Sequence, residues 1–107
     1  MTEGEVQKAV FEDLKARAMP GVVFWHVPND KSSRRKAGFR AGVSDVHALH
    51  RSKFYVVELK KTGGRATEDQ LEFIADVNHA GGFGCVAEGL PEALGILETW
   101  GLLRRAA

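Results

Sequence analysis

Two charged residues at the end of a strand-forming segment are the part of this sequence best suited to chemistry. Glu58 and Lys60 close the run Phe54–Val57, whose aromatic and β-branched residues favour a strand. Side chains two positions apart on a strand share a face, so Glu58 and Lys60 project together while Leu59 points the other way. A buried carboxylate and ammonium are costly unless they are paired or bind a ligand. The spacing therefore predicts a charged site at the end of this strand.

The expected hairpin brings a second carboxylate, that of Asp45, to Glu58. Val43–Leu49 also has the composition of a strand, and a short turn at Arg51 and Ser52 joins it to the next one. A turn centred between these two residues puts Asp45 opposite Glu58 on one face, with Cβ atoms about 5 Å apart. Two carboxylates that close repel unless a cation or a proton lies between them. A loop one residue longer would turn Asp45 to the other face.

The ligands available at such a site are oxygens, which suit Mg²⁺ or Mn²⁺. Zinc usually takes histidine or cysteine. His47 and His50 are three positions apart on an expected strand, so they point to opposite faces and form no metal pair. The single cysteine, Cys85, excludes both a disulfide framework and a cysteine zinc cage.

A third acid comes from the first helix, which we expect over about residues 3–18. Glu3 starts the inward stripe of this helix, and Glu5 is rotated away from it. The stripe continues through apolar residues at helical spacing, namely Val6, Val10 and Leu14. Spacing alone leaves a second interpretation open, in which both acids only favour the positive end of the helix dipole.

Gln70 also has two interpretations. It completes the capping-box pattern that begins at Thr67, which is a structural role. It also lies at the start of a helix that follows Lys60 through a glycine-rich loop, so its side chain could reach the same cluster of charges.

The positions of these residues depend on an expected order of elements α-β-β-β-α-β-α in one domain spanning residues 1–107. After the first helix we expect strands over 22–27, 43–49 and 53–60, a helix from Thr67 to the Gly81–Gly82 break, a strand over 83–87 and a helix over 91–100. The second and third strands form an antiparallel hairpin, and the fourth, which follows a helix, returns beside an earlier strand. The fold class is α/β with a mixed sheet flanked by helices.

Composition limits the function classes. The chain has 107 residues, 44% of them apolar, and a net charge of +1, so no global field favours nucleic acid. The first residues lack the pattern of a signal peptide, and no apolar run is long enough to cross a bilayer. We therefore expect a soluble, cytoplasmic protein without a membrane partner.

The charge is unevenly distributed along the chain, because five basic residues fall in one segment with no acid between them: Lys31, Arg34, Arg35, Lys36 and Arg40. Such a run is commonly a solvated loop.

The ordered set of these motifs resembles the VRR-NUC family of the PD-(D/E)XK nuclease superfamily. The matching motifs are Gly42-Val43-Ser44-Asp45, Val57-Glu58-Leu59-Lys60, Gly64-Arg65-Ala66-Thr67 with Gln70, and the helix residues Glu3 and Gln7. The resemblance covers residues 3 to 97. An E-x-K triplet alone is a weak signal, whereas the ordered set is much more specific. One departure is Ser44, where the family usually has proline; that position shapes the backbone and leaves the catalytic assignment little changed.

The resemblance implies a metal-dependent endonuclease with a restriction-endonuclease-like αβββαβ core. Asp45 and Glu58 would hold Mg²⁺ or Mn²⁺ together with the backbone carbonyl of Leu59. Glu3 would support the ion directly or through water. Lys60 would orient or activate the attacking water, and Gln70 would position Lys60 or the nucleophile.

The resemblance also implies a substrate and an assembly. Stand-alone members of about this length are similar to phage proteins that act as homodimers on branched DNA such as Holliday junctions. In that setting the basic run before Asp45 favours contact with DNA phosphates, extended by Lys61 and Arg65. Asn29 and His26, at the end of the first strand, could also touch substrate, although His26 equally fits an ordinary hydrogen-bonded strand residue.

Two alternatives remain open. A non-catalytic nucleic-acid-binding module of the same fold would bind DNA regardless of Asp45 and cleave nothing. A small interaction protein, in which Glu58 and Lys60 form only a salt bridge, would gain no thermal stability from a metal.

Overall fold

The computed structural model describes residues 1–28 and 37–106, and it has the predicted order of elements. In chain order the elements are α1 (Glu3–Arg17), β1 (Val23–His26), β2 (Val46–His50), β3 (Lys53–Lys60), α2 (Glu68–His79), β4 (Phe83–Glu88) and α3 (Leu90–Thr99). The α/β class with a mixed sheet is thus confirmed. The predictions for Asn29, Lys31, Arg34, Arg35 and Lys36 concern residues outside the described part of the chain.

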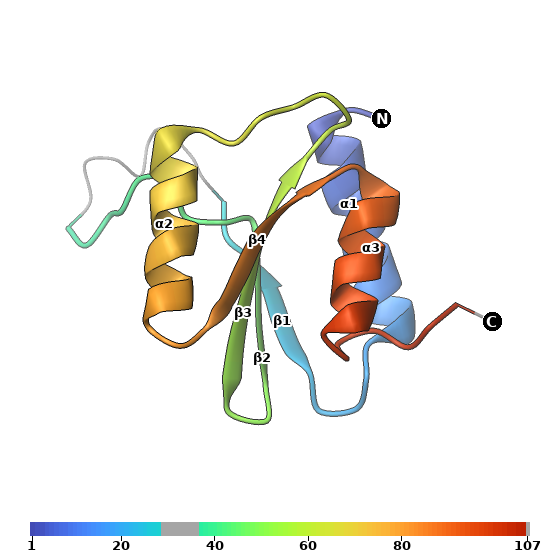
Figure 1. Ribbon diagram of the computed structural model, residues 1–107. Coiled ribbons are helices and arrows are strands. Elements are labelled where there is room, and N and C mark those ends of the chain that lie inside the picture. The colour runs from blue at the N-terminus through green and yellow to red at the C-terminus, as the bar shows by residue number, and fades with distance from the viewer. Residues whose placement is uncertain (29–36, 107) are drawn as a thin grey trace.

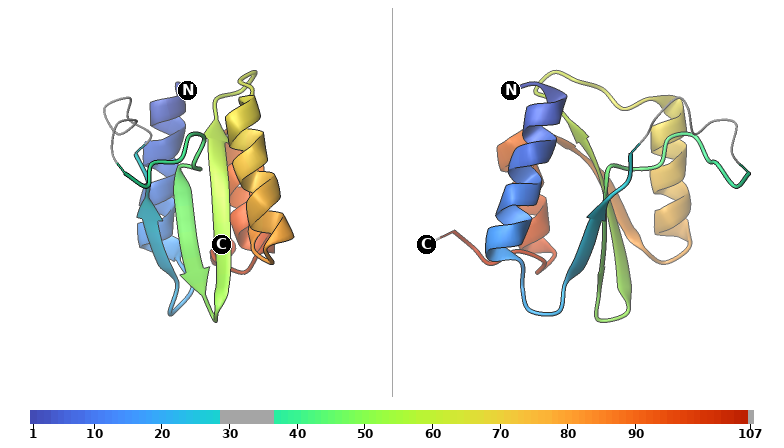
Figure 2. Two further views of the ribbon diagram at one scale, coloured as in Figure 1. Left: turned by 90° about the vertical axis from the view of Figure 1, so that its left-hand side faces the viewer. Right: turned by 180° about the vertical axis from the view of Figure 1, so that it is seen from behind.

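The strands form one sheet in the order β1-β2-β3-β4, with the helices on both sides of it. The pairs β1–β2 and β2–β3 are antiparallel, whereas β3 and β4 are parallel. Helix α2 covers one face, and α1 and α3 pack together on the other (Figure 1). Figure 2 shows α1 and α3 stacked on the same side when the molecule is seen from behind. Strand β3 is central, which explains why its last six residues are buried on both faces.

The β2–β3 hairpin has the predicted register. Val46 pairs with Val57 and His50 pairs with Lys53, so Arg51 and Ser52 form a two-residue turn. Both turn residues have positive φ, 51° and 66°, as the common two-residue hairpin turn that matches strand twist requires. Continuing the register by one residue puts Asp45 opposite Glu58.

Strand β2 begins at Val46, three residues later than the sequence pattern predicts. The cause is the preceding segment, which packs against the start of α2 (Figure 1). Gly42 has a φ of +80° and approaches the backbone of Asp69 and Gln70 so closely that a Cβ would overlap it. This docking keeps residues 43–45 out of the sheet ladder and sets the position of Asp45.

The main core lies between the sheet and the α1–α3 pair. The apolar residues of α3 and of the segment after it belong to this core: Leu97 and Leu103 are buried, and Leu94 and Trp100 pack against it. In the part of the chain that is described, no helix combines the length and the apolar character that a membrane crossing needs.

Candidate metal centre

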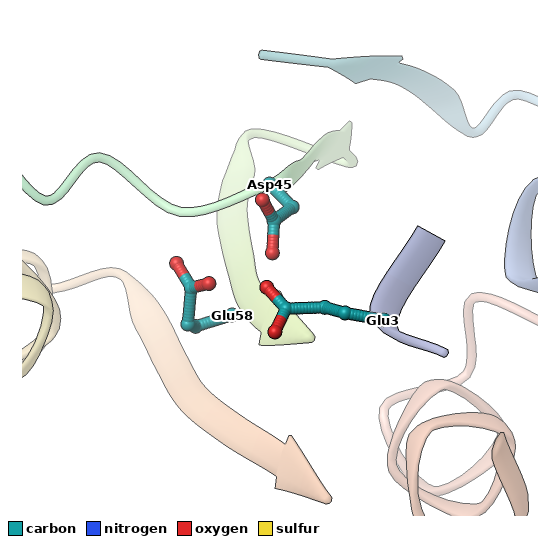
Figure 3. A group of neighbouring side chains, drawn as sticks. All are labelled: Glu3, Asp45 and Glu58. Atoms are coloured by element: carbon teal, nitrogen blue, oxygen red, sulfur yellow. The ribbon is translucent and has the colours of Figure 1, made fainter. Parts of the chain in front are cut away.

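Three carboxylates converge at the end of the sheet nearest the N-terminus (Figure 3). Glu3 reaches in from the first turn of α1, Asp45 precedes β2, and Glu58 projects from β3. One oxygen from each lies within 4.8 Å of the others. This spacing is close enough for a single cation to contact all three, so the trio could hold a metal ion.

Asp45 is held by the backbone of both neighbouring strands. Its Oδ2 accepts a hydrogen bond from the Leu59 amide at 2.9 Å, and its carbonyl accepts one from the Val27 amide at 2.9 Å. The amide and carbonyl of one strand residue point to the same edge of the strand. The Leu59 carbonyl therefore faces the side on which Asp45 lies, as a carbonyl ligand would need to.

Glu58 is the most deeply buried of the three acids, with 1% of its surface exposed. Burial, reinforced by a hydrogen bond to Asp45 and by the Asp45 charge, raises the pKa of Glu58 to about 9, while Lys60 opposes the shift. Its Oε1 has no hydrogen-bond partner among the described residues. A buried carboxyl with an orphaned oxygen is stable only with a proton or a cation, which is the condition that the hairpin register predicts.

Lys60 supplies a positive charge beside the acids. Its Nζ lies 3.6 Å from Glu3 Oε1 and 3.6 Å from Glu58 Oε2, and its side chain is 9% exposed. These distances exceed those of direct hydrogen bonds, so the ammonium is a neighbouring charge rather than a tight partner. The Lys60 ammonium can attract a negatively charged group that enters between Lys60 and the carboxylates.

The structure distinguishes Glu3 from Glu5. Glu5 belongs to a capping box with Thr2: its Oε1 accepts from the Thr2 amide at 3.0 Å, and the Thr2 hydroxyl accepts from the Glu5 amide. The backbone hydrogen bond from Thr2 is the main reason that the pKa of Glu5 is lowered. Glu5 is therefore a helix cap. The Thr-x-x-Glu pattern was visible in the sequence and would have assigned this role.

Gln70 fits both of the roles that the sequence suggests for it. Its Oε1 accepts from the Thr67 amide at 2.8 Å and closes the capping box of α2. It also lines a cavity of about 470 Å³ together with the acids. Seven residues line this cavity: Glu3, Gln7, His26, Pro28, Asp45, Glu58 and Gln70. Pro28 was not expected at the site. Gln7, which the motif resemblance included on the first helix, was given no role there, although it lies one helical turn after Glu3.

The described basic residues that were expected to contact DNA do not line the carboxylate cavity. Arg40 pairs with Asp76 on α2, and its guanidinium lies 5.2 Å from the centre of the Phe73 ring. Lys61 and Arg65 are exposed on the loop between β3 and α2. Both of these loop residues follow the strand that carries Glu58 and Lys60, so they remain candidates for contact with a long anion.

A larger groove of about 650 Å³ runs along β4, on the outer edge of the sheet. Side chains already occupy part of this edge: the Asn78 amide bonds to both backbone groups of Gly84, and Glu92 accepts from the Glu88 amide. The thiol of Cys85 lines the groove, and burial raises its pKa to about 11, so it is neutral and poorly nucleophilic. The carboxylate cavity, and not this groove, is therefore the candidate site for catalysis.

Solved structures share this architecture. One is described as a VRR_NUC domain protein; it is 22% identical, superposes with a TM-score of 0.78, and the match covers 99% of this chain and 98% of that one. This chain has the VRR-NUC fold. A second structure, described as a VRR_NUC domain, is 22% identical, with a TM-score of 0.68 and coverage of 94% and 99%. No protein-family model and no curated protein matches the sequence.

The fold that the motif resemblance implied is thus confirmed over nearly the whole chain. Both VRR_NUC structures are also matched along nearly their whole length, so the shared unit is the complete solved domain. Within this VRR-NUC fold, the residues that the resemblance selected on α1, before β2 and on β3 are the ones that converge in the carboxylate cavity.

Proposed function

We propose that this protein is a divalent-metal-dependent endodeoxyribonuclease. One observation carries the proposal: in a VRR-NUC fold, three carboxylates lie within 4.8 Å of one another beside a buried lysine. One of the acids, Glu58, has an orphaned oxygen and a raised pKa, which makes a cation at this point favourable.

The donor set fits a hard cation. Asp45 and Glu58 would be its protein ligands with the Leu59 carbonyl, and Glu3 would contact it directly or through water. Oxygen-only ligands favour Mg²⁺ or Mn²⁺ over zinc. Such an ion, when bound, would make water a nucleophile near neutral pH and neutralise charge on the phosphate.

The remaining site residues would act on the substrate and the attacking water. The Lys60 ammonium, already beside Glu58, would orient the water or stabilise the negative charge that develops on the phosphate. The Gln70 carboxamide, held at the start of α2 by its capping box, would position the water or Lys60. Both groups come from rigid elements, as precise positioning requires.

Exposed basic residues and the VRR-NUC resemblance both favour DNA as the substrate class. Lys61 and Arg65 are exposed on the loop that follows the strand of Glu58 and Lys60, and they would bind the phosphate backbone. The segment Lys31–Lys36 and Arg40 is the second candidate for DNA contact. Since Arg40 pairs with Asp76, its contribution requires that this exposed ion pair opens, which costs little because such pairs are weak.

We further propose selectivity for branched DNA and action as a homodimer, inside a cell and with a phage origin, as the VRR-NUC resemblance implies. Symmetric cleavage of a Holliday junction needs two cuts, and one chain offers one carboxylate cavity among its described residues. Sedimentation of the protein alone and with a four-way junction tests the assembly. We expect two chains per junction, and one chain per junction would contradict the dimer.

The enzymatic proposal is tested by cleavage of four-way, flap, single-stranded and linear duplex DNA in Mg²⁺ or Mn²⁺. Wild type should cut at least one of them, and Asp45→Asn and Lys60→Ala should be inactive while still folded and able to bind DNA. Lys53→Ala is the matched control, because Lys53 is an exposed lysine at the opposite end of the same strand. Unchanged cleavage by Asp45→Asn and Lys60→Ala would refute the assignment. DNA binding without cleavage by wild type would favour the non-catalytic module.

A further inference from the structure

His26 is a cavity residue that the proposed metal chemistry leaves without a role. It lines the same 470 Å³ space as Glu3, Asp45 and Glu58. The other lining residues are carboxylates, amides and a proline. Histidine is the side chain that enzymes use most often to transfer a proton to or from a reacting group.

The strand order puts His26 on the opposite side of Asp45 from Lys60. His26 is the last residue of β1, Asp45 directly precedes β2, and Glu58 and Lys60 lie on β3. Adjacent strands are about 4.8 Å apart, so β1 and β3 are separated by about 10 Å. The segment that carries Asp45 and β2 therefore lies between the strand that carries His26 and the strand that carries Lys60.

This strand order is compatible with an in-line displacement. In phosphoryl transfer the attacking and leaving oxygens lie on opposite sides of phosphorus. With the water on the Lys60 side, the leaving oxygen faces β1.

Local contacts fix the position of His26. Its ring packs edge-on against Phe11 of α1, with ring centres 5.9 Å apart at 77°. In the sheet it pairs with Val46, the residue after Asp45, and the next amide, that of Val27, bonds to the Asp45 carbonyl. The backbone that carries the imidazole is thus tied directly to the residue proposed as a metal ligand.

We propose that His26 is a catalytic residue that protonates the leaving oxygen of the cleaved phosphodiester, an inference that rests on the proposed nuclease function. Water forms the new oxygen–phosphorus bond, and the bond from phosphorus to the leaving oxygen breaks. The electron pair of the broken bond stays on that oxygen, which takes a proton from the imidazolium. The attacking water loses a proton to solvent, and the imidazole regains a proton from solvent. The net reaction is therefore hydrolysis of the phosphodiester.

The test uses DNA in which sulfur replaces the bridging oxygen of the cleaved bond, on the 3′ side in one substrate and on the 5′ side in the other. A thiolate leaves without needing a proton. His26→Ala should therefore slow cleavage of ordinary DNA by about 10²-fold or more, and slow cleavage of the matching sulfur substrate hardly at all. All reactions use Mg²⁺, which has little affinity for sulfur. The sulfur position that relieves the defect also identifies the broken bond.

Two variants and one binding measurement separate chemistry from structure. His26→Asn keeps a polar group at this position but transfers no proton, so it should behave like His26→Ala. His79→Ala, at the exposed far end of α2, should match wild type on both substrates. Affinity for uncut DNA, measured in chelator, should change little in each variant.

The outcomes distinguish this inference from the nuclease proposal. If wild type cleaves but His26→Ala and His26→Asn lose equal activity on the oxygen and sulfur substrates, His26 only supports the site and the proton-transfer role is wrong. Full activity of both variants on ordinary DNA would also refute it. If wild type cleaves no DNA with either metal, the nuclease proposal fails and this inference fails with it.

Discussion

Glu58 should make the metal-free protein less stable as the pH rises, and Glu58→Gln should remove that dependence. The pKa of Glu58 is raised from 4.5 to about 9 in the fold, chiefly by burial. Between these values the folded protein keeps the proton and the unfolded chain releases it. The stabilising effect of this proton is therefore complete below pH 4.5 and is lost progressively until the pH passes about 9.

The size of this change in stability follows from the linkage between proton binding and folding. One proton difference between the folded and unfolded states changes the free energy of unfolding by about 1.4 kcal/mol per pH unit. From pH 5 to pH 7 the loss is roughly 3 kcal/mol, a large share of the 5–15 kcal/mol typical of a small domain. Glu58→Gln keeps the shape and the neutral state, so it should flatten this slope.

Urea unfolding in chelator at several pH values measures the difference between wild type and Glu58→Gln. Taking the difference cancels groups that both proteins share, including His47, whose pKa is lowered by burial and whose effect appears as the pH falls. Added Mg²⁺ should stabilise wild type more at high pH, since the cation replaces the proton on Glu58. Parallel pH profiles for the two proteins would refute the reasoning.

Three further predictions concern single residues. Glu3→Gln should weaken Mg²⁺ binding about 10- to 100-fold by calorimetry, whereas Glu5→Gln should leave it intact, because Glu5 is a helix cap and glutamine can still accept the Thr2 amide hydrogen bond; equal effects would contradict the assignment of Glu3 to the cavity. Gly42→Ala should cost about 2 kcal/mol or more in urea unfolding, because φ is +80° and a Cβ would overlap the α2 backbone; Gly38→Ala, with the same φ but open space, should cost clearly less. Ser44→Ala should raise stability by about 1 kcal/mol, because its buried hydroxyl has no partner in the described part of the chain; a loss of stability would mean that the hydroxyl is satisfied.

The sequence predicted the central hairpin well because its signals are local. The strand-forming run ending at Glu58 and the two-residue turn at Arg51 and Ser52 together determine the register. Asp45 could therefore be matched with Glu58 before any tertiary contact was known. The helical phase of α1 likewise indicated Glu3, and the Thr2 capping box accounts for Glu5.

The features that the sequence could not predict depend on contacts between distant segments. The late start of β2 follows from the docking of Gly42 on α2, which no local pattern encodes. The contacts of Arg40 with Asp76 and Phe73 are likewise not encoded locally, because these partners belong to a helix more than thirty residues later in the chain. The presence of Pro28 in the cavity likewise requires the sheet order, because the end of β1 reaches the site only by the pairing of β1 with β2.

Diffraction from crystals soaked in Mn²⁺ and measured near the manganese absorption edge tests the carboxylate centre most directly. We expect an anomalous peak between Asp45 and Glu58, about 2.1 Å from an oxygen of each, with the Leu59 carbonyl also in contact. Crystals of Asp45→Asn soaked in the same way should show a much weaker peak. A wild-type map without a peak at this point, or an equal peak in Asp45→Asn, would contradict a metal centre built from these residues.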